Sequence, residues 1–181
     1  MYYQIEYRSP VGKMIVVCDG RQKHIVGLWI EGQKYFQATL SEEPHSGTDV
    51  PVLQKAEEWL DAYFAGKRPP VSDLPLAPEG GTFRQDVWKI LCEIPYGSVT
   101  TYGEIAKKMA VKMGRKTMSA QAVGNAVAHN PISVIIPCHR VVGTNGSLTG
   151  YAGGIDKKIN LLEHEGVDTS VYSRPQKSTA P

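Results

Sequence analysis

The stretch Ile135-Ile136-Pro137-Cys138-His139-Arg140-Val141-Val142-Gly143 is the part of the sequence around which the rest is organised. A β-branched apolar run enters it, Pro137 removes a backbone donor, and a thiol and an imidazole follow on consecutive residues. A cysteine thiolate is the strongest side-chain nucleophile, and a nearby base or cation lowers the pKa of the thiol. Cys138 and His139 therefore predict a nucleophilic site. The alternative is a buried structural cysteine beside a histidine that caps a turn.

Further segments accompany this core at fixed distances: Asn130–Pro131 precedes it, and 150–154 (GYAGG) and 161–166 (LLEHEG) follow it. Together they resemble the reactive-site motifs of the O6-alkylguanine-DNA alkyltransferases, single-turnover proteins that move an alkyl group from damaged guanine to their own cysteine. The resemblance covers residues 82–166, whereas residues 1–80 are similar to the family only in general layout. It implies DNA repair by direct reversal of damage, with O6-alkylguanine as substrate and O4-alkylthymine as a further candidate.

The composition is that of a globular protein, with 181 residues, 41% of them hydrophobic and 21% charged. No apolar run approaches the ~20 residues of a membrane span, and no signal peptide is visible. Cys18, Cys92 and Cys138 are odd in number and widely spaced, which suits neither a disulfide framework nor a zinc cluster. We therefore expect a protein of the reducing cytoplasm with no membrane contact.

The net charge of +2 is unevenly distributed along the chain. Residues 1–79 carry eight Lys/Arg and eleven Asp/Glu, whereas residues 80–181 carry twelve and seven. The stretch 105–155 contains six Lys/Arg and no acidic residue. A surface without acids next to the candidate nucleophile suits a phosphate backbone, while the alternative is a solvated Lys-rich helix end.

The first part of the chain predicts a small antiparallel sheet with one helix. Short β-branched and aromatic runs at 2–7, 13–18 and 24–31, separated by turn residues, indicate three strands. Apolar residues at helical spacing indicate an amphipathic helix over about 51–65, ended by Gly66. We expect an N-terminal α/β domain over 1–79, with a Pro-rich linker from about residue 66.

The second domain, 80–168, is expected to be mostly helical and to contain a helix-turn-helix, which makes the fold class α+β. Helices are predicted near 83–91, after Thr101, over 119–129 and over 156–165, and Thr101 and Glu104 have capping-box spacing. The 119–129 helix consists of small residues, which suits either close approach of nucleic acid or tight helix packing. We expect residues 169–181 to form a disordered tail.

The resemblance to the alkyltransferases implies a role for each candidate catalytic residue. Cys138 supplies the sulfur, His139 deprotonates it through a water, and Glu165 fixes the tautomer of the imidazole and favours its charged form. Asn130 ties the helix before it to the reactive loop. The Tyr102 hydroxyl meets the guanine ring and helps guanine leave as a neutral molecule.

The resemblance also implies the substrate pocket and the DNA-binding helix. The residues expected to line the guanine pocket, besides Tyr102, are Val141, Tyr151 and Ala152. The residues expected to meet double-stranded DNA through its minor groove, while the damaged base is flipped out, are Ala120, Gln121, Ala122 and Gly124. Many relatives carry Arg where this chain has Gln121. We expect a monomer.

Metal and cofactors are not expected. Some alkyltransferases hold zinc in the first domain, but here only Cys18 and His24 could mimic part of a four-ligand site. Two other functions remain open at this point. One is a cysteine hydrolase using Cys138, His139 and Glu165. The other is a non-enzymatic binder of DNA damage, a class that lacks the reactive cysteine.

Overall fold

A computed structural model describes residues 1–175 of the chain. The chain divides into two compact units. The first comprises Met1–Gly80 together with Pro131–Ile135, and the second comprises Gly81–Asn130 and Ile136–Pro181. None of the helices in the described part is long and apolar enough to cross a membrane.

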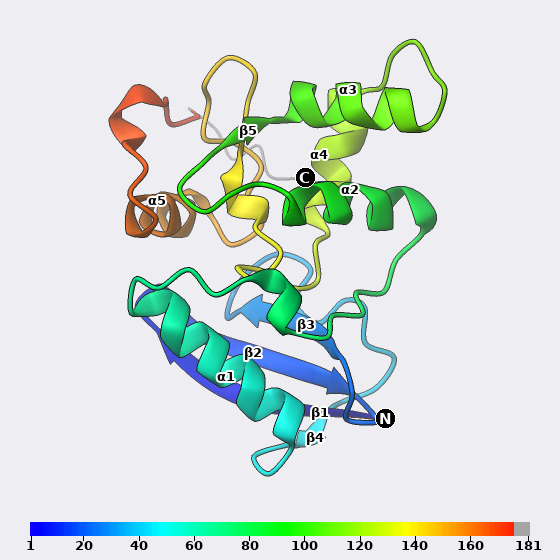
Figure 1. Ribbon diagram of the computed structural model, residues 1–181, viewed down its shortest axis with the longest axis vertical. Coiled ribbons are helices and arrows are strands. Elements are labelled where there is room, and N and C mark those ends of the chain that lie inside the picture. The colour runs from blue at the N-terminus through cyan, green and yellow to red at the C-terminus, as the bar shows by residue number, and fades with distance from the viewer. Residues whose placement is uncertain (176–181) are drawn as a thin grey trace. The chain divides into compact units, whose positions relative to one another are not determined.

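The first unit is built on a four-stranded sheet (Figure 1). Its strands are β1 (Tyr2–Ser9), β2 (Gly12–Asp19), β3 (Ile25–Ile30) and β4 (His45–Ser46), in the spatial order β3-β2-β1-β4. The three predicted strands are present and antiparallel. The sequence did not predict β4, which pairs parallel to the start of β1 through only two polar residues.

One helix and several loop segments cover the two faces of this sheet. Helix α1 (Pro51–Phe64) buries an apolar stripe that includes Trp59, Leu60 and Tyr63 and packs on β1 and β2, as its periodicity predicted. On the opposite face, Trp29 packs with Tyr2, and any side chain at Gly27 would collide with the Trp29 ring.

The expected linker is partly structured. After the short 3-10 helix η1 (Val71–Asp73), Pro75 and Ala77 exchange backbone hydrogen bonds with Ile25 of β3. The segment 131–133 pairs with the same strand, because Leu28 N–H donates to Pro131 and Ser133 N–H donates to the carbonyl of Leu28. Residues far apart in the sequence thus complete this edge of the sheet.

The second unit is mostly helical, so the α+β class is confirmed. Its elements are α2 (Thr82–Cys92), β5 (Thr100–Thr101), α3 (Tyr102–Lys112), α4 (Ala120–Ala128), η2 (Cys138–Arg140), β6 (Val141–Val142), α5 (Ile155–His164) and η3 (Thr169–Val171). The predicted cap is present, since the Thr101 side chain accepts a hydrogen bond from Glu104 N–H. The small residues of α4 allow α2 to approach closely, and the Trp88 indole donates to the Ala126 carbonyl at 2.9 Å.

The prediction of disorder over 169–181 is wrong for residues 169–175. Beyond η3, Ser173 exchanges backbone hydrogen bonds with Gly146 and Leu148, and Arg174 pairs with Asp156. The backbone of a loop 25 residues upstream thus orders this polar segment, a contact that composition does not reveal. The remainder, 176–181, lies outside the described residues.

Candidate active site

The candidate nucleophile lies in a tight loop inside the second unit. Cys138 opens the 3-10 helix η2, its N–H donates to the Ile136 carbonyl at 2.8 Å, and only 6% of the residue is exposed. The Asn130 side chain donates to the same carbonyl at 2.8 Å, which ties the end of α4 to the loop. Burial raises the pKa of the Cys138 thiol, while the Asn130 hydrogen bond and the charge of Lys158 act in the opposite direction.

The imidazole and the carboxylate predicted from the sequence do meet. His139 Nε2 lies 2.6 Å from Glu165 Oε2, and both side chains are completely buried. Because a carboxylate accepts, Nε2 carries the hydrogen and Nδ1 is left as the acceptor of the ring. His139 Nδ1 has no hydrogen-bond partner among residues 1–175. The arrangement therefore presents a buried base next in sequence to the thiol.

Burial lowers the pKa of His139, and the positive charges of Arg140 and Lys158 lower it further, whereas Glu165 raises it. The expectation that Glu165 favours the charged imidazole is correct in direction, but burial is the larger effect. At neutral pH these two pKa directions favour a neutral imidazole and a protonated thiol before the reaction.

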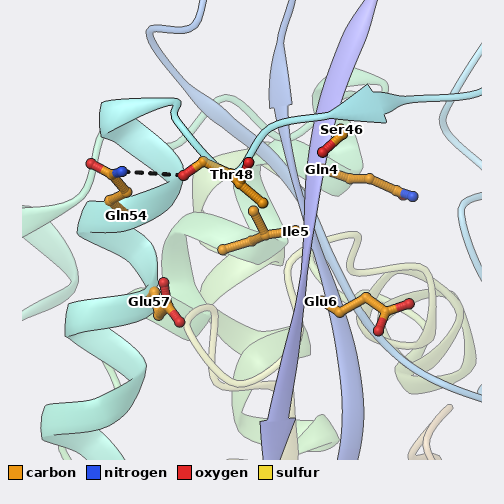
Figure 2. Close-up of a pocket in the computed structure, with 7 residues that line it drawn as sticks. All are labelled: Gln4, Ile5, Glu6, Ser46, Thr48, Gln54 and Glu57. Atoms are coloured by element: carbon orange, nitrogen blue, oxygen red, sulfur yellow. Dashed lines mark hydrogen bonds between the residues drawn. The ribbon is translucent and has the colours of Figure 1, made fainter.

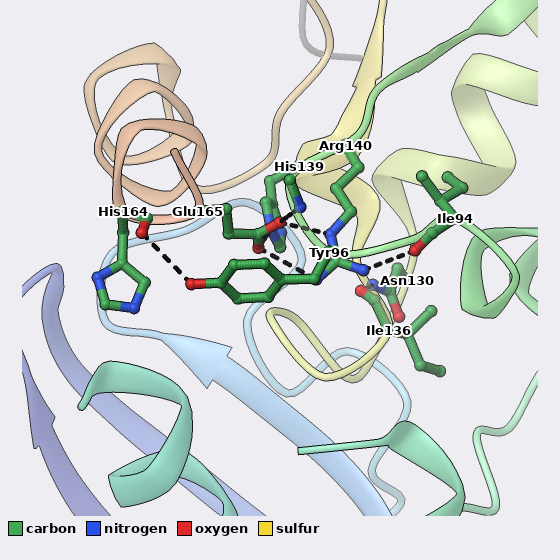
Figure 3. A network of polar contacts seen from close by, with 9 residues as sticks. Ile94, Tyr96, Asn130, Ile136, His139, Arg140, His164 and Glu165 are labelled. Atoms are coloured by element: carbon green, nitrogen blue, oxygen red, sulfur yellow. Dashed lines mark hydrogen bonds and ion pairs between the residues drawn. The ribbon is translucent and has the colours of Figure 1, made fainter. Parts of the chain in front are cut away.

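Figure 3 shows the Glu165 carboxylate between the side chains of His139 and Arg140. Arg140 donates two hydrogen bonds to the carboxylate, from Nε to Oε1 at 2.7 Å and from Nη2 to Oε2 at 3.2 Å. The Gly97 N–H also donates to Oε1, at 3.1 Å. The third guanidinium nitrogen of Arg140, Nη1, donates to the Ile94 carbonyl at 2.7 Å, and the guanidinium carbon lies 5.7 Å from the centre of the Tyr96 ring. With His139, four N–H donors hold the carboxylate in one orientation.

A buried lysine that we did not single out from the sequence lies on α5. Lys158 Nζ donates to the carbonyls of Val141 and, at 2.8 Å, Thr149, and burial lowers its pKa to about 7. Lys158 thus links β6, through Val141, to the loop that precedes 150–154, through Thr149. Its spacing from Leu161 and Leu162 places it on the apolar stripe of the helix, which is the signal that could have revealed it.

Several of the residues predicted from the sequence line a cavity of about 460 Å³, although Cys138, His139 and Glu165 are not among its lining residues. It is lined by Tyr102, Ala120, Gln121, Gly124, Asn125, Gly143, Thr144, Thr149 and Gly150. The Tyr102 hydroxyl donates to the Thr149 carbonyl at 2.9 Å. A Cβ at Gly150 would lie 2.2 Å from that hydroxyl, so glycine is required there.

The other predicted pocket residues lie outside this lining. Val141 is buried in β6, and Tyr151 is buried with a hydroxyl that has no hydrogen-bond partner within the described chain. Ala152 and Ala122 are half-buried, and Ala122 N–H donates to the capping side chain of Ser119.

The basic stretch 105–155 is free of acids only in sequence. Lys112 Nζ lies 2.8 Å from Asp86 Oδ1, which α2 contributes from outside the stretch. Arg115 and Lys116, in the connection between α3 and α4, are exposed.

Within residues 1–175, no three His, Cys, Asp or Glu side chains gather in a way that could hold a metal ion. His24 Nδ1 lies 3.0 Å from Asp19 Oδ2.

Comparison with family models assigns both parts of the chain. Residues 1–78 match "6-O-methylguanine DNA methyltransferase, ribonuclease-like domain", and residues 82–167 match the DNA binding domain of the same family.

Individual relatives agree with this result. The chain is 39% identical to a methylated-DNA–protein-cysteine methyltransferase of Haemophilus influenzae, covering 90% of this chain and 86% of the relative. It is 42% identical to that of Methanosarcina barkeri, covering 91% and 97%. Among solved structures it is similar to Mycobacterium tuberculosis OGT in complex with DNA, with a TM-score of 0.76, 39% identity and coverage of 91% and 93%.

Proposed function

We propose that Cys138 is the alkyl acceptor of this chain, which belongs to the 6-O-methylguanine DNA methyltransferase family and is a DNA-repair transferase. The assignment rests on the buried hydrogen bonds around the thiol: His139 pairs with Glu165, and the Asn130 side chain donates to the Ile136 carbonyl in the loop that holds Cys138.

The reaction begins with loss of the Cys138 proton to His139 Nδ1 through a water. The thiolate then attacks the alkyl carbon, so that a C–S bond forms and the C–O bond to guanine breaks. The charge that develops on guanine is neutralised by a proton from the Tyr102 hydroxyl, which in the resting site donates to the Thr149 carbonyl. The Tyr102 oxygen then regains, through solvent, the proton that His139 took from Cys138, so that one proton passes in total from the thiol to guanine. A thioether has no good leaving group, and each protein molecule therefore reacts once.

The proposed partner is double-stranded DNA, approached from the minor groove by α4. A guanine in the duplex cannot present its O6 substituent to a buried thiol and must be flipped out. Ala120, Ala122 and Gly124 permit close approach of the backbone, and Gln121 occupies the vacated stack. Ala120, Gln121 and Gly124 line the same cavity as Tyr102, which supports a path for the flipped base.

We propose that the protein acts as a monomer in the cytoplasm, since a nucleophilic thiol needs a reducing compartment.

The first prediction identifies the acceptor. After incubation with duplex DNA containing O6-methylguanine, peptide mass mapping should find one methyl group per protein, on Cys138. Cys92 is an internal control because it is the exposed thiol, whereas Cys18 is buried with a pKa raised to about 11. Nonselective alkylation would modify Cys92 first. A methyl group on Cys92 or Cys18 contradicts the assignment. So does any methyl transfer to the Cys138→Ser variant.

The second prediction concerns Gln121. Gln121→Ala should slow repair of duplex DNA by roughly tenfold, since unstacking a base costs a few kcal/mol that Gln121 partly offsets. It should leave the reaction with free O6-benzylguanine unchanged, because that substrate needs no flipping. The measurement is the pair of second-order rate constants.

Two further variants test whether the effect belongs to the side chain at position 121. Gln121→Arg, with its longer planar cation, should match or exceed the native rate on duplex DNA. Asn125→Ala, one turn further along α4 at the same cavity, is the matched control. Equal slowing of both substrates by Gln121→Ala would assign Gln121 to the pocket itself, and no slowing would assign the stacking role elsewhere.

A further inference from the structure

The two edges of the sheet in the first unit are closed to different extents. Along β3, the segments 75–77 and 131–133 supply backbone partners. Along the outer edge of β1, the partner is β4, which pairs only with Tyr3 and Gln4. After Gly47 N–H donates to the Gln4 carbonyl at 2.9 Å, the chain leaves the sheet for α1.

The rest of β1 exposes backbone groups that point outward. Peptide groups alternate sides along a strand, so Glu6 and Arg8 face the same edge as Gln4. Ser9 pairs with Gly12 of β2 at the end of the hairpin, so the odd-numbered residues of β1 face β2 and the even-numbered residues face the outer edge. Within residues 1–175, no backbone partner occurs on that edge beyond Gln4. An unpaired edge of this kind is a template for another strand.

A groove of about 490 Å³ runs along this edge (Figure 2). Its walls are Gln4, Ile5 and Glu6 of β1, the end of β4, and Gln54 and Glu57 of α1. The Gln54 side chain donates to the Thr48 carbonyl and holds the departing chain against the helix. The groove lies where a longer β4 would continue, and its volume is in the range of ligand-binding pockets.

The charge of the groove is negative. Glu6 and Glu57 line it, and no Lys, Arg or His is among its lining residues. Asp61, one turn beyond Glu57, accepts a hydrogen bond from the Tyr7 hydroxyl at 2.7 Å. Lys13 lies 3.7 Å from the Glu6 carboxylate but closer to Glu31, at 3.0 Å, and the Glu6 side chain remains 59% exposed.

We propose that this edge binds an extended, basic segment of a partner protein as an additional strand beside β1. The outward N–H and C=O groups of Glu6 and Arg8 supply main-chain hydrogen bonds, as in other strand-addition complexes. Lysine or arginine side chains of the segment pair with Glu57 on the helix side and with Glu6 on the opposite face. The site uses none of the residues assigned to alkyl transfer, and it gives the first unit a function of its own.

The test uses the full chain labelled with ¹⁵N and a capped hexapeptide, Val-Lys-Val-Lys-Val-Lys. The amide signals of Glu6 and Arg8 should shift on titration, and their hydrogen exchange should slow. The same peptide methylated at alternate backbone nitrogens should fail to bind, since it keeps the charges and loses the donors. Glu57→Lys should weaken binding roughly fivefold or more, whereas Glu58→Lys, the same change at an exposed neighbour on α1, should not.

Several results overturn the proposal. One is the absence of a shift at millimolar peptide. A second is equal binding of the methylated peptide, which would mean attraction by charge alone, and a third is equal weakening by Glu58→Lys. Shifts of Glu6 and Arg8 that depend on protein concentration without peptide would assign the edge to a second copy of this chain instead.

Discussion

Glu165→Gln is expected to lower the free energy of unfolding by about 3–5 kcal/mol, because it leaves a buried guanidinium without its anion. Arg140 is 7% exposed and directs two of its nitrogens at this carboxylate. A glutamine amide also turns a donor toward either Arg140 or His139, both of which donate. Urea unfolding monitored by fluorescence measures the loss.

A double-mutant cycle with Arg140→Met separates this effect from lost packing. If the charge pair is responsible, the double variant should be more stable than the sum of the two single losses implies, by at least about 1 kcal/mol. Strict additivity would show that Glu165 and Arg140 contribute independently. Asp86→Asn, which breaks the partly exposed pair with Lys112, is the control and should change stability by less than about 1 kcal/mol.

Lys158→Met is expected to remove a pH dependence of stability. Burial lowers the pKa of Lys158 from 10.5 to about 7. Between these two values the unfolded chain binds one proton more than the folded protein, so the free energy of unfolding rises with pH. The slope due to this residue is up to about 1.4 kcal/mol per pH unit and vanishes below pH 7, where both states are charged.

The measurement is the difference in unfolding free energy between native protein and Lys158→Met at several pH values from 6 to 9.5. This difference should grow with pH above about 7, because other titrating groups cancel between the two proteins. Lys157→Met makes the same chemical change at the preceding, half-buried residue and should give a flat difference. A flat difference for Lys158→Met as well would contradict a neutral, buried lysine.

Most elements of the fold follow from local sequence patterns. The helix over Pro51–Phe64 follows from apolar spacing and its end from Gly66, and the start of α3 follows from the spacing of Thr101 and Glu104. These signals are local because capping and periodicity involve residues within a few positions of one another. β4 was missed because His45 and Ser46 have no strand pattern, and the backbone of β1 imposes their pairing.

The α+β class and the family were predicted from the sequence and are confirmed, because spaced motifs carry that information. The same motifs led to the proposal that Cys138 is the nucleophile and that His139 and Glu165 are its partners. The contacts and charges of these groups depend on the tertiary structure. It placed Arg140 on the same carboxylate as His139, buried the lysine of α5 between two carbonyls, and left half of the β1 edge unpaired. These outcomes depend on burial and on partners 9 to 42 residues away in the sequence. Desolvation, nearby charges and hydrogen bonds, which only packing supplies, together set the charge of a buried group.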